Sequence, residues 1–487
     1  MFLVLVVYVF LFGWLAFRRY NACVTQSGDT AVFECAFYNT LHGNLFWNFG
    51  AASCYFEAHP EPLMFLYVPL YAIAPSPEIL IFIQILCIAV SSIPVFLIGC
   101  KVLRHEGAAV LAAVAFLFFP SIVSQNISQV HTAVFPLPFL LFAFYYFQEG
   151  RFWCFVILLA VASCGWESSA MTGTMFTLYA LWKRRGPRWV LTSLVIPVGI
   201  LAFNLGIVRS HFVRGIEYSV FRHFPGLGNS MREFVQLAIT HPGLVVERLL
   251  TTRNALYLIL LLTAVGGVLP FFAIEVLFVL PELCLNLLGD DGMKVIAYLY
   301  NVRVGAFLIV ATLYATARMQ RLLERKLSGG CYTPVITGCV AMMCLASWWQ
   351  WFNPQEYQYD VVHETRQRAF KRIPADDSLV AGPGQVLAHL AHRKLLADQK
   401  MITANPNQAF NYNWVFFDMN YQRPILGEFV PRELLIAYGT NANYQLIFAE
   451  NNIYILRRKE AIPPSQVTPI RYMSDEPLLR KMQGGGS

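Results

Sequence analysis

Ionisable side chains that could do chemistry gather in one polar stretch, residues 18–63, of an otherwise apolar chain. Among them are Asp29, Glu34, His42, Glu57 and His59. Ionisable groups at a membrane face are costly unless they are paired, hydrated or functional. A carboxylate in such a place can take a proton from an attacking hydroxyl group, and a histidine can bind a metal ion. We therefore expect this stretch to contribute to an active site or a binding site.

The composition is that of a membrane protein. The chain has 487 residues, of which 57% are hydrophobic and 13% are charged, whereas a soluble domain carries about 25% charged residues. The net charge of +7 fits basic cytoplasmic loops. The basic residues form no patch interleaved with aromatic residues, so we expect no nucleic-acid partner. We expect the membrane lipids themselves to be partners.

Eleven apolar runs are candidate membrane spans, since a span needs about 20 residues. They lie near 2–17, 79–100, 108–123, 132–148, 152–166, 169–182, 189–207, 254–269, 271–288, 303–317 and 332–350. Basic residues gather at 101–104, 151, 183–188 and 318–326. These clusters fall on one side if the amino terminus is cytoplasmic, although Arg18 and Arg19 run against this orientation. The first span would be a signal anchor that is not cleaved.

This orientation divides the chain into a transmembrane domain, 1–350, and an extracytoplasmic domain, 351–480. The loops 18–78 and 208–253 would also be extracytoplasmic, and 481–487 resembles a linker with its GGGS end. Strand patterns at 378–382, 414–418 and 444–458 alternate with helix patterns at 384–393 and 430–439. Such alternation predicts a small α/β layer. The fold class is therefore an α-helical polytopic membrane protein of about eleven spans with a small extracytoplasmic α/β domain at its carboxyl end.

Five segments carry a resemblance to a known family. They are DTAVFECAFYNTLHGN (29–44), HPEPLMFLYVPLYAIAPSPEILIFIQ (59–84), SQVHTAVFPLPFLLFAFYYF (128–147), RHFPGLGNS (222–230) and RIPADDSLVAGPGQVLAHLAHRK (372–394). In this order they resemble a bacterial and archaeal family of predicted multi-span membrane proteins of uncharacterised function. That family is itself similar to the GT-C glycosyltransferases, which use lipid-linked sugars.

The resemblance implies a GT-C-like bundle in the cytoplasmic membrane of a bacterium or archaeon. It implies transfer of a sugar from a polyprenyl-phosphate donor to an acceptor at the outer face. In that reaction the resemblance makes Asp29 the base, with Glu34 and Glu167 as further catalytic acids. Asp29 can equally be a turn former after Gly28. Glu34 lies about 140° from Asp29 around a helix, so it is either a second acid or a surface charge.

The expected topology puts further side chains on the same membrane face as Asp29. We expect Glu57, His131, Arg222 and His223 to bind substrate, and His59 and His131 to be candidate ligands of a divalent metal. His131 can instead cap a span, and Glu167 can pair with a loop arginine. The arginine-rich loop 208–253 can bind phosphate through Arg222 or touch lipid headgroups through a helix at 232–250. Asp290 and Asp291, between glycines, favour a turn over a metal pair.

Other patterns leave alternatives open. The cysteines show no zinc-type spacing, and Cys23, Cys35 and Cys54 share the first loop, where one disulfide can form if the loop is extracytoplasmic. Walker, nucleophile-elbow and HExxH motifs are absent from the sequence. A non-catalytic subunit that holds a membrane complex through 351–480 is the second hypothesis, and a carrier of lipid-linked sugar is the third.

Overall fold

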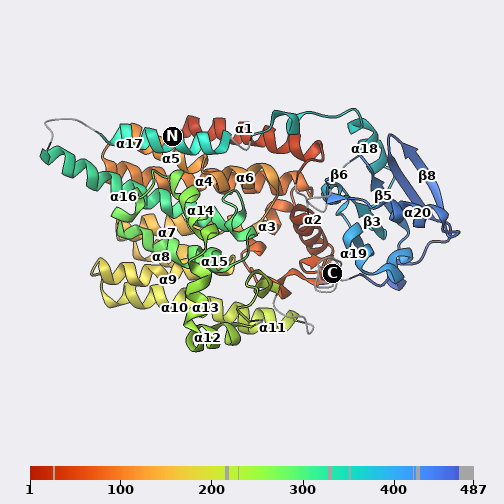
Figure 1. Cartoon of the computed structure of the whole chain (residues 1–487), viewed down its shortest axis with the longest axis horizontal. Helices are drawn as coiled ribbons and strands as arrows, with labels where there is room; N and C mark the ends of the chain where they lie inside the picture. Colours follow the sequence, from red (N-terminus) through yellow and green to blue (C-terminus); the bar gives the residue numbers. More distant parts are fainter. Residues whose placement is uncertain are drawn as a thin grey trace. The chain divides into compact units, whose positions relative to one another are not determined.

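The computed structural model describes residues 1–25, 28–213, 219–228, 230–326, 332–349, 352–420, 422–423 and 428–470; the expected linker 481–487 lies outside them. The chain forms two compact units, and many of their elements are labelled in Figure 1. Unit 1 comprises Met1–Phe17, Phe56–Leu70 and Leu80–Gln355, and unit 2 comprises Arg18–Tyr55, Tyr71–Ile79 and Glu356–Ser487. The first polar stretch is therefore divided between the two units.

Unit 1 is helical. Three of its helices, α1 (Phe2–Asn21), α3 (Met64–Tyr71) and α4 (Pro77–Leu103), also contain residues of unit 2. The others are α5 (Glu106–Leu117), α6 (Pro120–Ser128), α7 (Leu137–Glu149), α8 (Phe152–Ser163), α9 (Glu167–Trp182), α10 (Pro187–Phe203), α11 (Arg209–Phe212), α12 (Met231–Thr240), α13 (Pro242–Leu249), α14 (Thr252–Thr263), α15 (Leu280–Leu288), α16 (Val302–Lys326) and α17 (Thr333–Trp349).

Helical segments coincide with each of the eleven expected spans. In the described part of the chain, four helical segments are long and apolar enough to cross a membrane: Phe2–Asn21, Pro77–Leu103, Pro187–Phe212 and Leu299–Leu323. The helices α5 and α6 make a fifth span if the pair, bent by 52°, is counted as one. The apolar helices α8, α14 and α17 are shorter. The count of eleven spans stays a prediction.

An aromatic cluster holds several of these helices together. Phe144 of α7 meets Phe278 edge-on at 5.2 Å and Phe307 of α16 at 6.0 Å. Phe278 stacks on Phe307 at 5.0 Å and contacts Phe176 of α9 at 4.7 Å. All four rings are buried, and such offset or edge-on pairs stabilise a core beyond their buried area. The cluster fixes α7, α9 and α16 against one another.

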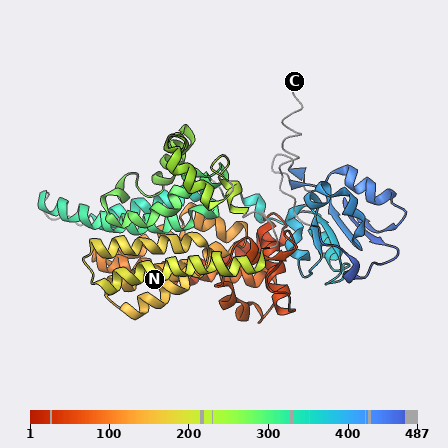
Figure 2. The ribbon, with the colours of Figure 1, turned by 90° about the horizontal axis from the view of Figure 1, so that it is seen from below.

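Unit 2 contains a small sheet and short helices (Figure 2). Its five-stranded sheet has the order β4-β3-β5-β9-β8, in which β3 is parallel to β4 and β5 while β5, β9 and β8 are antiparallel. The elements are α2 (Gly28–Leu41), β1 (Trp47–Asn48), β2 (Ser53–Cys54), α18 (His363–Phe370), β3 (Leu379–Gly382), β4 (Leu396–Asp398), α19 (Gln399–Ala404), β5 (Trp414–Asp418), β6 (Gln422–Arg423), β7 (Glu428–Phe429), α20 (Arg432–Thr440), β8 (Tyr444–Glu450) and β9 (Ile453–Arg458).

The α/β pattern predicted for the carboxyl-terminal segment is confirmed with one correction. The predicted strands and the hairpin correspond to β3, β5, β8 and β9, and the second predicted helix corresponds to α20. The hairpin turns at Asn451 and Asn452, whose φ angles of 48° and 58° suit the tight turns that join twisted strands. The helix predicted over 384–393 is shorter than expected and of the 3-10 type, because it comprises Gly384–Leu390 after Pro383.

Candidate functional site

A cavity of about 450 Å³ lies within unit 1. Its wall comes from the beginning of α9, from α10 and the π-helical turn Asn204–Val208 that follows it, from the turn Ser219–His223, and from α12 and α15. Much of the wall is apolar, as at Leu201, Leu205 and Phe234. A concave apolar site with a few convergent polar groups is the usual form of a small-molecule site.

Glu167 and His59 form a polar pair in this wall. Glu167 is the first residue of α9, so its carboxylate lies at the positive end of the helix dipole. The Nδ1 atom of His59 lies 3.3 Å from both carboxylate oxygens, and its ring stacks on Trp166 at 4.3 Å. Gly165 allows this close turn, because a Cβ there would lie 2.9 Å from Pro136. Two residues predicted to share a site are thus in contact.

His131 lies next to this pair but has a structural bond of its own. Its Nδ1 accepts a hydrogen bond from the backbone N–H of Ala133 at 3.1 Å, so it caps the short turn Thr132–Val134. Its ring lies 4.7 Å from that of Trp166. Burial lowers the pKa of His131 to about 3, helped by the nearby charges of His59 and Arg303. The capping alternative is confirmed, and the imidazole is neutral at physiological pH.

Arg222 and His223 reach the cavity from the turn Ser219–His223. The Nδ1 atom of His223 lies 2.8 Å from a carboxylate oxygen of Asp290, and the N–H of Asp290 donates to the carbonyl of His223 at 2.8 Å. This double contact ties the turn to the loop after α15. The side chain of Arg222 is exposed, and within the described residues it forms no ion pair. It can therefore meet an anion in the cavity.

The loop around Asp290 and Asp291 is a turn, which is the alternative that the sequence favoured over a metal pair. Asp290 also accepts a hydrogen bond from the N–H of Met293 at 3.2 Å, and Asp291 pairs with Arg253 at 3.0 Å. The segment predicted as an interfacial helix forms α12 and α13, which are divided at His241 and Pro242.

A buried polar group in the cavity wall was missed by the sequence reasoning. Glu282 of α15 pairs with Arg303 at the start of α16, and Ser168 of α9 donates to Glu282 at 3.2 Å and accepts from Arg303 at 2.5 Å. Asn286, one turn further along α15, is also buried and lines the cavity. The signal was present in the sequence, because an ionisable residue inside an apolar run, as in PELCLN, marks a site by default.

The remaining candidate residues lie elsewhere. Glu57 is buried in unit 1, where its carbonyl accepts a hydrogen bond from Nε of Arg209 at 3.1 Å, and it does not line the described cavity. Asp29 and Glu34 both belong to α2 in unit 2, with Asp29 half-buried in the first turn. Because the two acids are five positions apart on one helix, they point to different faces, as predicted.

Glu34 is not a surface charge, and that alternative is wrong. It is fully buried, and its Oε1 atom lies 2.5 Å from Nε2 of His392 and accepts a 2.5 Å hydrogen bond from the hydroxyl of Tyr71. Burial raises the pKa of Glu34, and the contact with His392 opposes this rise.

No metal centre emerges from the geometry of the described residues. Among them, no group of three or more His, Cys, Asp or Glu side chains is arranged to hold a metal ion. His59 and Glu167 could supply two ligands, while His131 uses Nδ1 as a cap. A divalent metal at His59 and His131 stays a prediction, and no chemical step is derived through it.

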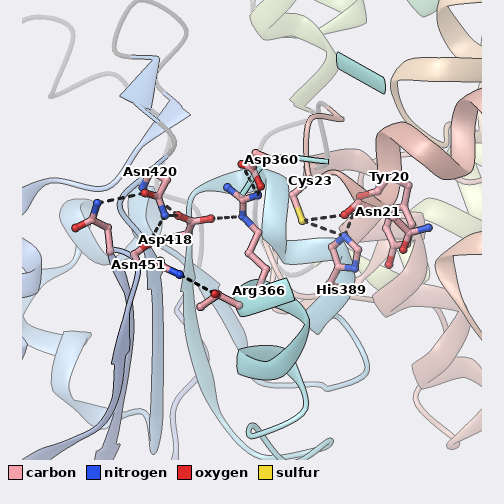
Figure 3. Close-up of polar contacts among 11 residues, drawn as sticks. Tyr20, Asn21, Cys23, Asp360, Arg366, His389, Asp418, Asn420 and Asn451 are labelled. Atoms are coloured by element: carbon pink, nitrogen blue, oxygen red, sulfur yellow. Dashed lines mark hydrogen bonds and ion pairs between the residues drawn. The ribbon is translucent and has the colours of Figure 1, made fainter. Parts of the chain in front are cut away.

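Unit 2 contains a cysteine–histidine contact that resembles a nucleophilic pair (Figure 3). The Sγ atom of Cys23 lies 3.5 Å from Nε2 of His389, which lies 3.0 Å from the carbonyl of Tyr20. Burial raises the pKa of Cys23 to about 12 and lowers that of His389 to about 4. Since a reactive cysteine needs a lowered thiol pKa, this contact is structural. Among the described residues, Cys23 and Cys35 are not joined by a disulfide.

Several solved structures have some likeness to this chain. ArnT from Cupriavidus metallidurans, bound to undecaprenyl phosphate, is 12% identical with a TM-score of 0.49, over 93% of this chain and 99% of that chain. The Archaeoglobus fulgidus oligosaccharyltransferase in complex with Zn and sulfate is 16% identical with a TM-score of 0.44, over 86% and 68%. The arabinofuranosyltransferase AftD from Mycobacteria is 9% identical with a TM-score of 0.47, over 94% and 40%. At these identities the likenesses concern the fold alone.

The sequence comparisons identify the family. No curated protein sequence matches the chain. A family model described as predicted membrane protein (DUF2079) matches residues 23–451. This range includes all five segments that carry the resemblance. The chain belongs to this family of predicted membrane proteins, and it is a membrane-embedded protein.

Proposed function

We propose that the protein is a GT-C-like glycosyltransferase that transfers a sugar from a polyprenyl-phosphate donor to an acceptor at the outer face of the cytoplasmic membrane. One observation carries the proposal: an apolar cavity in unit 1 has in its wall the exposed Arg222, which forms no ion pair among the described residues, and the Asp290-bound His223. Apolar walls suit a polyprenyl chain, and a guanidinium fork matches phosphate oxygens.

The reaction needs a leaving phosphate and a proton acceptor. The acceptor oxygen forms a bond to the anomeric carbon of the sugar while the bond from that carbon to the phosphate oxygen breaks. The electron pair leaves with the lipid phosphate, where Arg222 would stabilise the charge. The proton of the acceptor hydroxyl would go to a carboxylate. Glu167, oriented by His59 at 3.3 Å, is the candidate base in the cavity.

The family resemblance assigns the role of the base to Asp29. It assigns the role of a supporting acid to Glu34. Asp29 is half-buried in the first turn of α2. Glu34 is engaged by Tyr71 and His392, which suits an orienting role better than proton transfer to a substrate. Asp29→Asn and Glu167→Gln therefore test two alternative bases, because each keeps the side-chain shape and removes the proton acceptor.

A binding experiment tests the phosphate assignment. Full-length protein in nanodiscs is titrated with undecaprenyl phosphate and with the neutral alcohol undecaprenol. Arg222→Ala should weaken binding of the phosphate about tenfold, since a charge-assisted hydrogen bond is lost, and should leave undecaprenol binding unchanged. Arg232→Ala is the matched control, because Arg232 is exposed on α12 and does not line the cavity. Equal loss in both variants would contradict the assignment.

A turnover experiment tests the reaction. Release of undecaprenyl phosphate is followed from undecaprenyl phosphate that carries glucose, mannose, galactose or arabinose. Replacing the true base, by Glu167→Gln or Asp29→Asn, should slow release about 100-fold while phosphate binding persists. Movement of the lipid across the bilayer without release would favour a carrier. Absence of lipid binding, with a protein partner lost on surface changes in 351–480, would favour a scaffold subunit.

A further inference from the structure

Helix α15 brings two hydrogen-bond acceptors to the wall of the cavity. Glu282, Leu285 and Asn286 all line it, as expected for residues three and four apart, which share one face of a helix. Glu282 and Asn286 are both buried. Each has an oxygen atom, Oε2 of Glu282 and Oδ1 of Asn286, for which the described residues supply no hydrogen-bond partner. We call these two residues the acceptor pair.

The other oxygen of Glu282 is fully engaged. Its Oε1 atom accepts from the guanidinium of Arg303 and from the hydroxyl of Ser168. Arg303 is fixed in turn by a 2.7 Å bond to the carbonyl of Ala133. The carboxylate therefore has its charge balanced and its orientation fixed, and Oε2 is left for another donor.

The amide of Asn286 is fixed by the hydrogen bonds of its nitrogen. Its Nδ2 atom donates to the carbonyl of Tyr300 at 3.0 Å, to Oδ1 of Asn301 at 3.2 Å and to the hydroxyl of Tyr257 at 3.1 Å. A backbone carbonyl can only accept, so exchanging the nitrogen and oxygen of the amide would lose this bond. The unpartnered atom is thus an acceptor.

Two buried acceptors with no matching donors define the chemistry of a ligand. A phosphate or carboxylate supplies acceptors only and would be repelled. An ammonium group gains little, because Arg303 already balances the charge of Glu282. Hydroxyl groups supply donors without charge, and a buried acceptor left unpaired is costly. The acceptor pair therefore favours a polyol.

We propose that Glu282 and Asn286 form a hydroxyl-binding subsite that takes the five- or six-carbon sugar of a polyprenyl-phosphate sugar. The assignment rests on the proposed function. It gives the cavity two chemically distinct parts: Arg222, on the turn Ser219–His223, takes the phosphate, and the acceptor pair on α15 takes sugar hydroxyls. Apolar residues of the wall, such as Leu201 and Phe234, take the chain.

The test compares lipids with and without a sugar. Full-length protein in nanodiscs is titrated with undecaprenyl phosphate and with undecaprenyl phosphate that carries glucose, mannose, galactose or arabinose. At least one sugar-bearing lipid should bind about tenfold more tightly than the sugar-free lipid, since two hydrogen bonds are gained. Asn286→Leu should abolish this gain while sugar-free binding is retained, which also shows that the variant is folded.

A second variant leaves the internal hydrogen bonds of the wall in place. Leu285→Phe adds bulk between the two acceptors and should also abolish the gain from the sugar. Leu287→Phe is the matched control on the same helix, because Leu287 does not line the cavity, and it should behave like the native protein. Loss of the gain in the control as well would contradict a local subsite.

The outcomes separate this inference from the proposed function. Arg222-dependent binding of sugar-free lipid with no gain from any of the four sugars would overturn the subsite and leave the phosphate assignment standing. Absence of lipid-phosphate binding would overturn both. Free glucose that binds with Asn286 dependence, without a gain for any lipid-linked sugar, would assign the polyol subsite to a free sugar and overturn the donor assignment.

Discussion

A buried arginine meets a buried carboxylate in each unit, but the two ion pairs are completed differently. In unit 2, Asp418 accepts from Nε of Arg366 at 2.6 Å through one oxygen, and from the backbone and side-chain amides of Asn420, both at 2.9 Å, through the other (Figure 3). Arg366 also reaches both oxygens of Asp360 at 2.7 and 2.8 Å. In unit 1, Glu282 has one oxygen without a partner among the described residues.

The difference separates a pair that holds the fold from one that can also bind a ligand. A buried ion pair is tolerated when its remaining hydrogen-bonding atoms are satisfied. Asp418, at the end of β5, meets that condition from within the protein. For Oε2 of Glu282 the described residues supply no partner, and the proposed sugar hydroxyl would meet the condition. The comparison predicts that damage to the first pair costs stability, while damage to the second changes binding first.

The largest effect is expected from breaking the Arg366–Asp418 pair. Arg366→Met leaves the buried carboxylate of Asp418 without its cation, which should lower the free energy of unfolding by about 3–5 kcal/mol. Thermal unfolding of the full chain in one detergent measures it. Arg368→Ala is the matched control, because its partner Glu450 and Arg368 are both about half exposed, and exposed pairs contribute less than about 1 kcal/mol. Equal losses would mean that burial does not distinguish the two pairs.

A smaller effect is expected from the pH dependence of unit 2. The ring of His389 lies half-buried between those of Tyr20 and Phe370, and its desolvation lowers its pKa to about 4. Between pH 6.5 and 4 the unfolded chain takes up a proton that the folded chain excludes. The contribution of His389 to the free energy of unfolding is therefore complete above pH 6.5. It is lost as the pH falls, by about 1.4 kcal/mol per pH unit and up to about 3 kcal/mol in all.

His389→Phe keeps the stacked ring and removes this titration. Thermal unfolding measured at several pH values from 7 to 4 should show a shallower loss of stability in the variant than in the native protein. The exposed His42 in the same unit provides the matched surface control, as His42→Phe. A slope that stays the same in His389→Phe would assign the acid sensitivity to other groups.

Much of the fold could be predicted from residue patterns. Apolar runs located the helices, because a span excludes charge over a long stretch, and strand periodicity located β5 and the β8–β9 hairpin. The helix expected at 384–393 is present as the 3-10 helix Gly384–Leu390, and local preference does not distinguish this type from an α-helix. Pairing of distant segments, such as β3 between β4 and β5, has no local signal.

The candidate site was predicted in part. His59 and Glu167 are 108 positions apart, and the assumption of a shared membrane face was enough to suggest their contact. The link between His223 and Asp290 was missed, because the same Asp residue also suits a turn. Glu282 and Arg303 were missed because the sequence places them on separate apolar segments, and only packing shows that each neutralises the other.

The smallest effect is expected from Ser168→Ala, which tests how much the Glu282–Arg303 pair in the cavity wall contributes to stability. The hydroxyl of Ser168 bridges Glu282 and Arg303, but the direct ion pair remains when it is removed. The loss should be about 1 kcal/mol in the free energy of unfolding, the net value of a hydrogen bond. The neighbouring Ser169→Ala is the matched control, because Ser169 is buried and its hydroxyl has no partner among the described residues, so its loss should be near zero. A loss for Ser168→Ala as large as that for Arg366→Met would mean that the pair in the cavity wall is as structural as the pair in unit 2, and the distinction between them would fail.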